Sequence, residues 1–282
     1  MLPNLTPKEL ERYSRQIQLP GFGEEAQQKL KNSTALVTGV GGLGGTAALY
    51  LAVAGIGKLI LVRGGELRLD DMNRQILMTD DWVGQPRVLK AKETLAAINP
   101  DVEIEAVNDY VTPENVDFLV RQSDIALDCP HNFVERDLLN EACVRWQKPM
   151  VEAAMNGMEA YLTTILPGKT GCLSCLFPEK PDWDRRAFGV IGAVSGTLAC
   201  LAALEAIKVL TALETPLFSQ LLTMNLSQMD FAKYRTYHDR HCPVCGHLHP
   251  DHQPTQPHSL PLFQSSPTPQ SSPTSQSLLQ TV

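Results

Sequence analysis

A glycine-rich turn between an apolar run and an alanine-rich segment is the feature that most constrains how this chain can fold. The turn, Gly39-Val40-Gly41-Gly42-Leu43-Gly44, follows the β-rich run 34–40 and opens the segment 45–56. Glycines allow a tight turn there and let backbone N–H groups approach a phosphate at the positive end of the following helix. This strand–turn–helix predicts a nucleotide-binding α/β fold with Gly39, Gly41, Gly42 and Gly44 as contacts; the alternative is a glycine-rich packing turn.

The chain continues to alternate between strand and helix patterns as far as about residue 155. Strands are predicted at 58–63, 102–111 and 125–129, and helices at 87–100, 113–122 and 133–147. That order implies a Rossmann-like, doubly wound parallel sheet covered by helices on both faces. Later strand patterns at 161–168 and 221–237 surround a long small-residue helix at 194–213, so the parallel sheet is expected to continue into a C-terminal mixed sheet.

Three regions follow from these patterns. Residues 1–33 form an N-terminal helical arm, with the helix over 7–31 broken at Pro20-Gly21, and residues 34–245 form the nucleotide-binding domain. From Gly246 onward Pro, Ser, Thr and Gln dominate, and no Lys or Arg follows Arg240. Such a composition buries too little apolar surface to offset the entropy of ordering, so residues 246–282 are predicted to be a disordered tail. Irregular spacing of its four histidines favours a solvated tail over a metal site.

Composition and charge exclude several classes of protein. The net charge of −7 and the pI near 5.5 argue against a nucleic-acid or membrane-surface binder, because both need a basic face. No run approaches the roughly 18 apolar residues of a membrane helix. The polar N-terminus lacks the apolar core of a secretion signal. We therefore expect a cytoplasmic protein with neither nucleic acid nor membrane as a partner.

Four of the seven cysteines form two Cys-x-x-Cys pairs, which are Cys172 with Cys175 and Cys242 with Cys245. In an unexported protein such pairs indicate metal or redox chemistry before structural disulfides. Two pairs supply the four thiolates of a closed tetrahedral Zn²⁺ site. Redox activity is the alternative, and it is disfavoured because neither pair opens a helix in a thioredoxin-like context. The remaining cysteines, Cys129, Cys143 and Cys200, are expected to be packed rather than reactive.

Arg63 occupies the end of the second predicted strand, where nucleotide-binding folds usually carry a ribose-binding acid. An Arg at this place can accommodate a 2′-phosphate, which leaves an NADP-dependent oxidoreductase open as a hypothesis. That hypothesis ranks last, because the chain has no recognisable acid/base set for such a substrate.

Several spaced motifs together resemble one family. They are RYSRQIQLPGFGEEAQQKLKNSTALVTGVGGLGG, MNRQILMTDDWVGQPRVLKAKETLAAINP, ALDCPHNFVERDLLNEAC and the two cysteine pairs. Over about residues 7–247 the chain resembles the MoeB/ThiF family of ubiquitin-activating (E1-like) adenylyltransferases. LVRGGELRLDDMNRQ and DCPHNF look most like its HesA branch, which is known from nitrogen-fixation gene neighbourhoods.

The resemblance implies an activity, cofactors and a partner. Family members bind ATP and Mg²⁺ and adenylate the C-terminal carboxylate of a small β-grasp protein, either ubiquitin-like or a sulfur carrier. They are homodimers, and they place structural zinc at the equivalent cysteine pairs. In members that use a catalytic cysteine it precedes the GV(I/L)G stretch. The corresponding segment here, PEKPDWDRRAFGVIG, has none, so covalent catalysis is not supported.

Site residues also follow from the resemblance. Arg74, within Asn73-Arg74-Gln75, matches the phosphate-binding Arg, and Arg15 matches an Arg that reaches the neighbouring subunit's site. Asp128, Asn132 and Arg136 match the loop that lies against the nucleotide and the target's tail.

Three positions depart from the family pattern: Arg63 replaces a ribose-binding Asp, Arg87 a phosphate-binding Lys, and His131 a Mg²⁺-binding Asp. Arg87 keeps a cation, whereas imidazole is a poor ligand for Mg²⁺, which prefers oxygen. A relocated carboxylate is expected among Glu66, Asp70 and Asp71. We therefore expect an adenylyltransferase with a weakened Mg²⁺ site, acting in sulfur, molybdenum-cofactor or metallocluster assembly. The alternative is a non-catalytic E1-like scaffold or binding module.

Overall fold

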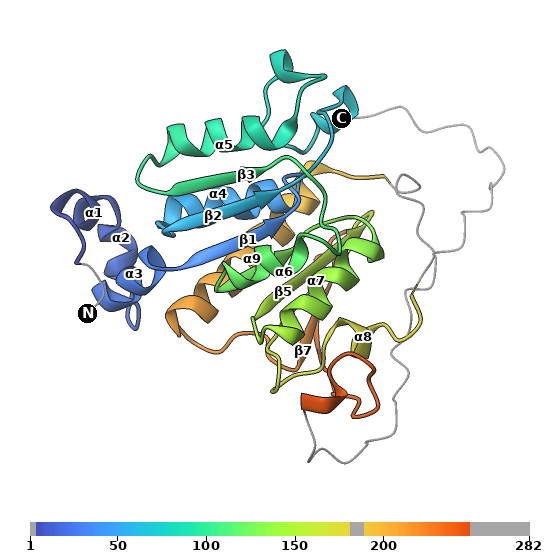
Figure 1. Ribbon diagram of the computed structural model, residues 1–282. Helices are drawn as coiled ribbons and strands as arrows, with labels where there is room; N and C mark the ends of the chain where they lie inside the picture. The colour runs from blue at the N-terminus through green and yellow to red at the C-terminus, as the bar shows by residue number, and fades with distance from the viewer. Residues whose placement is uncertain (1–3, 181–188, 249–282) are drawn as a thin grey trace, which may run out of the picture.

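One eight-stranded sheet organises residues 4–180 and 189–248, which are the residues that the computed structural model describes (Figure 1). Its strands are β1 (Thr34–Thr38), β2 (Lys58–Val62), β3 (Glu103–Val107), β4 (Ile125–Asp128), β5 (Met150–Asn156), β6 (Glu159–Ile165), β7 (Gln220–Asn225) and β8 (Asp230–Arg235). The spatial order is β3-β2-β1-β4-β5-β6-β7-β8. Pairing is parallel from β3 through β5 and antiparallel from β5 through β8. The predicted fold class, a mainly parallel sheet with a C-terminal extension, is confirmed.

Helices cover the two faces of the parallel strands and build two separate cores. The helices are α4 (Gly44–Ala54), α5 (Arg87–Ile98), α6 (Val116–Arg121), α7 (Phe133–Arg145) and α9 (Gly192–Thr211). One core joins α4, α5 and α9 to Val37 and Leu59, and the other joins α6 and α7 to Leu36 and Ile60. Because successive strand side chains point to opposite faces, each central strand contributes to both cores and is mostly apolar.

Helix α9 corrects two expectations from the sequence. It is 20 residues long and apolar enough to cross a membrane by length and composition alone, so the expectation that no run reaches that length is wrong. It packs against α4, β5 and β6, as the core helix of a sheet does. Cys200 was expected in the core, but it is exposed. The helical period buries Leu198, Ala199, Ala202 and Ala203 and leaves Cys200 and Leu204 on the outer side.

The N-terminal segment forms three short helices, α1 (Pro7–Arg12), α2 (Ser14–Ile17) and α3 (Gly23–Lys31). The chain therefore breaks at Tyr13 as well as near the expected Pro20-Gly21. Tyr13 is buried beside Gly55, and its hydroxyl accepts a 3.0 Å hydrogen bond from Asn99. Gln16 donates to the carbonyl of Ala54 at 2.7 Å. These contacts dock the three helices at the carboxyl end of α4.

The strand and helix boundaries differ from the sequence prediction in a few places. β5 was missed because its sequence, MVEAAMN, carries a glutamate and shows no alternation. Four short helices were also missed: α8 (Leu173–Leu176), η1 (Leu69–Asp71), η2 (Asp80–Trp82) and η3 (Gly246–Leu248). The disordered tail was predicted from residue 246, but residues 246–248 form η3. The rest of that tail, 249–282, and most of the cysteine-free segment (181–188) lie outside the described residues. The three-region division remains a prediction.

Gly55 tests the docking of the N-terminal helices. It ends α4 with φ +86°, and a Cβ there would lie 2.4 Å from the Tyr13 ring. Gly157 has a similar φ of +60° but nothing within 4 Å of a Cβ, so it serves as the matched control. We expect Gly157→Ala to lower the free energy of unfolding by about 1 kcal/mol, through the left-handed backbone alone. Gly55→Ala should cost about 2–5 kcal/mol, because overpacking adds to it. Equal losses in urea titrations would contradict this docking.

Candidate nucleotide site and cysteine cluster

The glycine turn lies at the carboxyl end of β1 and leads directly into α4. Gly39 has φ +111°, and its N–H donates to the carbonyl of Val62 at 2.8 Å. A Cβ at Gly44 would lie 1.9 Å from the Gly39 carbonyl oxygen, and one at Gly42 would lie 2.6 Å from Ser195 Oγ. Leu43, the residue before α4, gives no side-chain cap to the helix. The turn is therefore too close for side chains and leaves the first N–H groups of α4 for an anion.

Asp71 brings the two predicted phosphate-binding arginines together. Its side chain is 9% exposed. One oxygen accepts from Arg74 Nη2 at 2.9 Å, and the other lies 3.1 Å from Arg87 Nη1. Arg87 also donates to the carbonyls of Gly65 and Glu66. Because a guanidinium has fixed donor directions, these bonds set the orientation of both cations.

Arg74 connects this pair of cations to the glycine turn. A Cβ at Gly42 would lie 3.1 Å from Arg74 Cβ. Arg74 Nη1 donates to the backbone carbonyl of Asp70 at 2.7 Å and to Asn73 Oδ1 at 2.8 Å. Asn73 in turn donates to the carbonyl of Val190, just before α9. The turn, the η1 segment and the start of α9 therefore meet at one place.

Arg63 and His131, two of the departures from the family pattern, contact each other. Arg63 Nη2 lies 2.8 Å from His131 Nε2. Because a guanidinium can only donate, His131 Nε2 is the acceptor, and the imidazole is neutral with its proton on Nδ1. Arg63 is buried, 3.9 Å from Glu135 and 5.2 Å from the centre of the Tyr110 ring. Gly64 leaves room for that ring, because a Cβ there would lie 2.7 Å from it.

The other candidate carboxylates and Asn132 have different surroundings. Glu66 and Asp70 are exposed, and Asp70 pairs with Arg68 at 3.0 Å. Asn132 caps α7, since its Oδ1 accepts from the Glu135 N–H at 2.9 Å. Sequence reasoning missed Glu135 and Tyr110. Their signals were weak: Tyr110 lies at the end of the predicted strand 102–111, and Glu135 lies in the first turn of a predicted helix.

Asp128 lies below the nucleotide-facing surface, not on it. It is fully buried at the end of β4 and pairs with Arg136 of α7 at 3.0 Å. Glu152 of β5 and Tyr161 of β6 complete this group, and the sequence analysis did not single them out. Burial raises the pKa of Asp128 well above its usual range, although the charge of Arg136 opposes this shift. The sequence did offer a signal for this group, because Glu152 lies inside an otherwise apolar strand.

Arg15 does not reach the site of its own chain. It is exposed on α2, beside the carboxyl end of α4, whereas the glycine turn is at the amino end. The 11 residues of α4 separate the two by about 16 Å.

The residues at the nucleotide site do not form an oxygen-rich Mg²⁺ site. Asp71 is occupied by two arginines, Asp128 is buried against Arg136, and His131 is bonded to Arg63. Across residues 4–180 and 189–248, the one group with three or more potential metal ligands close together is the cysteine cluster. Mg²⁺ takes oxygen ligands, so this donor set does not suit it.

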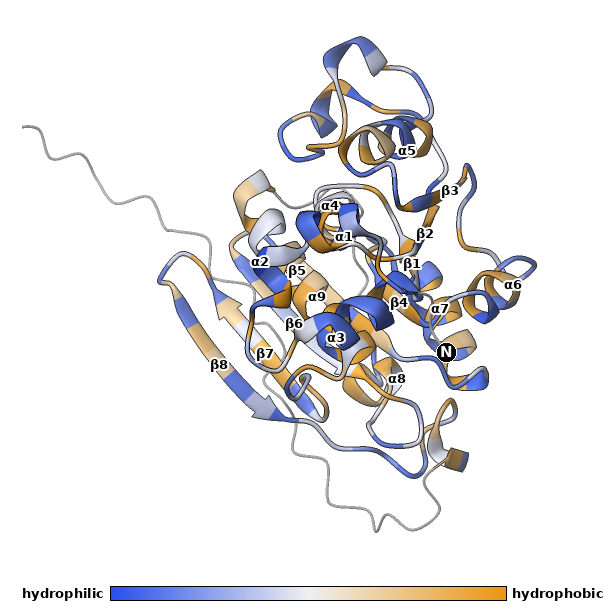
Figure 2. Ribbon diagram, turned by 90° about the vertical axis from the view of Figure 1, so that its left-hand side faces the viewer, coloured by the Kyte–Doolittle hydropathy of each residue, from blue (hydrophilic) through white to orange (hydrophobic). Residues whose placement is uncertain are grey.

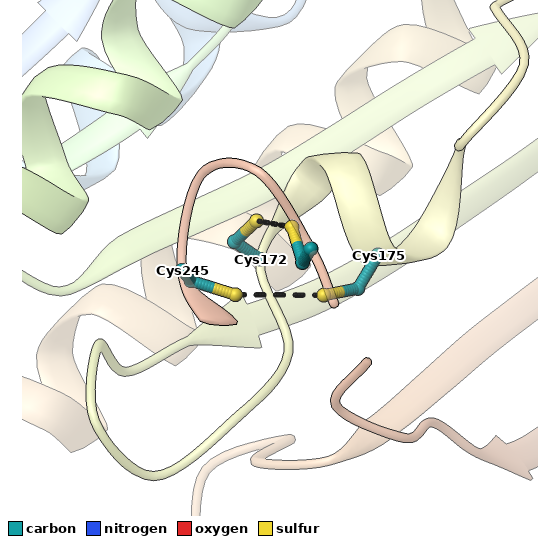
Figure 3. Close-up of side chains that lie close together, drawn as sticks. Cys172, Cys175 and Cys245 are labelled. Carbon is teal, nitrogen blue, oxygen red and sulfur yellow. Dashed lines mark hydrogen bonds between the residues drawn. The ribbon is translucent and has the colours of Figure 1, made fainter. Parts of the chain in front are cut away.

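The four paired cysteines do fit a metal. Their sulfurs all lie within 4.8 Å of one another, with Cys172–Cys242 at 3.7 Å and Cys175–Cys245 at 3.5 Å (Figure 3). A tetrahedral Zn²⁺ with bonds of about 2.3 Å places its sulfurs about 3.8 Å apart. The cluster can therefore bind zinc.

Cys129 and Cys143 are inert by comparison. Burial raises the pKa of both thiols, and the charge of Asp128 adds to the effect. A thiol held protonated is a poor nucleophile, so both are packed cysteines, in agreement with the prediction.

Comparison with known proteins identifies the class to which this fold and site belong. The ThiF family model matches residues 13–244, and the chain belongs to the ThiF family. It is 36% identical over 245 residues to the sulfur carrier protein ThiS adenylyltransferase of Escherichia coli K12, covering 86% of this chain and 97% of that protein. It is 38% identical over 252 residues to the SAMP-activating enzyme E1 of Haloferax volcanii, covering 87% of this chain and 92% of that protein.

A closer similarity is to proteins named HesA. The chain is 76% identical over 255 residues to protein HesA of Leptolyngbya boryana, covering 90% of this chain and 91% of that protein. Among solved structures, E. coli MccB with ATP superposes with a TM-score of 0.75 at 25% identity, covering 86% of this chain and 75% of that chain. The resemblance drawn from the motifs is therefore confirmed.

Asp71→Asn tests whether one carboxylate holds both arginines. The amide cannot pair with two guanidiniums, so both should lose their fixed orientation. A charged hydrogen bond is worth about 1.5–3 kcal/mol, so we expect ATP to bind about 10- to 100-fold more weakly by calorimetry. Asp80→Asn, on the exposed η2, is the matched control and should bind ATP like the wild type. An unchanged ATP affinity in Asp71→Asn would show that Asp71 does not contribute to the site.

Cysteine substitutions test the metal cluster. Cys172→Ser or Cys245→Ser should abolish bound zinc in elemental analysis and lower the melting temperature. The reason is that structural zinc couples about 10 kcal/mol or more of binding energy to folding. Cys200→Ser, outside the cluster and exposed, should retain zinc. A wild-type protein that is fully folded without any metal would rule out the assignment.

Proposed function

We propose that this protein is an ATP-dependent adenylyltransferase that activates the C-terminal carboxylate of a small β-grasp protein, either ubiquitin-like or a sulfur carrier. The pairing of Arg74 and Arg87 through Asp71, beside the uncapped start of α4, carries the proposal. In adenylation a carboxylate attacks the α-phosphate while pyrophosphate leaves. Fixed cations and backbone N–H groups stabilise the charge that spreads over the phosphates.

Relatives support the choice of substrate. A ThiS adenylyltransferase and a SAMP-activating enzyme each align over most of their length with this chain. From the resemblance of the motifs to the HesA branch we further propose a role in cofactor or metallocluster assembly linked to nitrogen fixation, in the cytoplasm.

We also propose that Mg²⁺ contributes less here than in relatives. Arg63 and His131 place a cation and a neutral imidazole where the family pattern has two carboxylates. Mg²⁺ brought by ATP would thus keep phosphate and water ligands rather than gain a protein carboxylate. Calorimetric titrations of ATP with Mg²⁺ and with a chelator should give similar affinities, whereas a strong Mg²⁺ requirement would oppose this view.

A non-catalytic scaffold is the second candidate, and the same Arg63–His131 contact favours it. It predicts ATP binding without chemistry. ATP–pyrophosphate exchange in the presence of a β-grasp partner separates the two candidates. The proposed enzyme exchanges label only when the partner's C-terminal carboxylate is present, and Arg74→Ala abolishes the exchange. No exchange by the wild type with any β-grasp partner would favour the scaffold.

A homodimer is part of the proposal. Apolar side chains are exposed on α4 and α9, including Tyr50 at 47%, Val53 at 42% and Leu204 at 48%. A second copy covering them would also bring an Arg15 to a site that lacks one of its own. Figure 2 looks onto the N-terminal helices and shows α2 close to α4, where Gln16 of α2 donates to the carbonyl of Ala54.

Mixing two inactive variants tests the shared site. Arg15→Ala and Arg74→Ala should each lose exchange activity, because each site would need Arg74 of its own chain and Arg15 of the other. Co-refolded in equal amounts, they should recover about a quarter of wild-type activity, since half of the dimers would hold one intact site. If light scattering verifies the mixed dimers and exchange activity does not recover, Arg15 lies outside the site.

A further inference from the structure

Two buried carboxylates lie side by side below the nucleotide site. Asp128 of β4 and Glu152 of β5 are register partners in adjacent parallel strands, so their side chains point to the same face, toward α7. Both are completely buried. The mechanism proposed above gives Glu152 no task.

One guanidinium serves both carboxylates. Arg136 Nη1 donates to Asp128 Oδ2 at 3.0 Å and to Glu152 Oε1 at 2.5 Å. Arg136 Nη2 donates to the carbonyl of Pro130 at 2.8 Å and to that of Ala153 at 3.2 Å. Arg136 thereby ties the strand ends to the turn that carries His131. Tyr161 donates its hydroxyl to Glu152 Oε1 at 2.9 Å.

The charges of this group do not balance if both acids are ionised. Two carboxylates face one guanidinium, and an unpaired buried charge is costly. The other titratable groups that act on Asp128 include Glu135 of α7, Tyr161 of β6 and Cys129, none of which is cationic. The next cation, Arg63, lies 3.9 Å from Glu135 and faces that carboxylate. Asp128 Oδ1 and Glu152 Oε2 have no donor within the described part of the chain. A proton on Asp128, hydrogen-bonded to Glu152, removes the excess charge.

We propose that Asp128 keeps its proton at neutral pH and donates it to Glu152, so that the two side chains act as a carboxyl–carboxylate pair that holds Arg136, and with it the Pro130–His131 turn. The pair is a pH-sensitive element in the wall of the nucleotide site. Its existence does not depend on the function proposed above.

The pair should leave a signature in the pH dependence of stability. Above about pH 5 the unfolded chain has both acids ionised, whereas the folded chain keeps one proton. The folded state therefore binds one proton more, and its stability falls as pH rises. The unfolding equilibrium constant increases about tenfold per pH unit from this source, up to the folded pKa of the pair.

Glu152→Gln removes this signature while keeping the hydrogen bonds. The amide oxygen still accepts from Arg136 and Tyr161, and the amide nitrogen donates to Asp128, which is then ionised and paired one-to-one with Arg136. Tyr161→Phe is the matched control, because it removes a neutral donor and leaves the charges unchanged. In urea titrations from pH 5 to 7, we expect the wild type and Tyr161→Phe to share the same pH slope. The folding equilibrium constant of Glu152→Gln, divided by that of the wild type, should rise about tenfold per pH unit.

Infrared spectroscopy of the wild type gives a test that does not depend on the variant folding. The carbonyl stretch of a protonated carboxylic acid should be present at pH 7 and resist exchange into deuterated buffer as a buried group does. Absence of that band, or identical pH slopes in the wild type and Glu152→Gln, would overturn the proposal.

Discussion

The carboxylate of Asp71 is the interaction on which the site depends. It is nearly buried, and each of its two oxygens pairs with one guanidinium, Arg74 or Arg87. A single carboxylate therefore fixes the positions of two cations. Without it, two adjacent guanidiniums would repel and turn toward solvent. The glycine turn supplies the complementary part, because its close backbone leaves the start of α4 for an anion. The proposed phosphate site therefore combines one acid, two cations and a helix terminus.

The fold explains why these parts meet. Parallel strands bring the ends of β1, β2 and β4 to one edge, and the segments that follow them carry the glycine turn, Arg63 and His131. Two cores on opposite faces fix the sheet rigidly, and α9 starts against Asn73 and Arg74. The cysteine cluster lies away from the turn, in the core that contains α7, so a metal there would stabilise the same helix that positions Arg136.

Local patterns in the sequence predicted much of this structure, whereas contacts between residues far apart in the chain could not be predicted. The glycine turn, the parallel order and the cysteine cluster each leave a short signature of residue type and spacing. The Arg63–His131 contact joins residues 68 positions apart, and neither residue alone announces its partner. Likewise the shared Arg136 could be found only once β5 was known to lie beside β4. Cys200 was misplaced because a small-residue helix does not reveal from composition which side faces the core.

We expect the arginines held by Asp71, Arg74 and Arg87, to bind the phosphates of ATP. Calorimetric titration of the wild-type protein with ATP, ADP and AMP tests this expectation most directly. If the two cations and the helix terminus provide the binding energy, affinity should fall at each step as phosphates are removed. Equal affinities for the three nucleotides would show that recognition rests on the nucleoside and that the two arginines do not bind the phosphates.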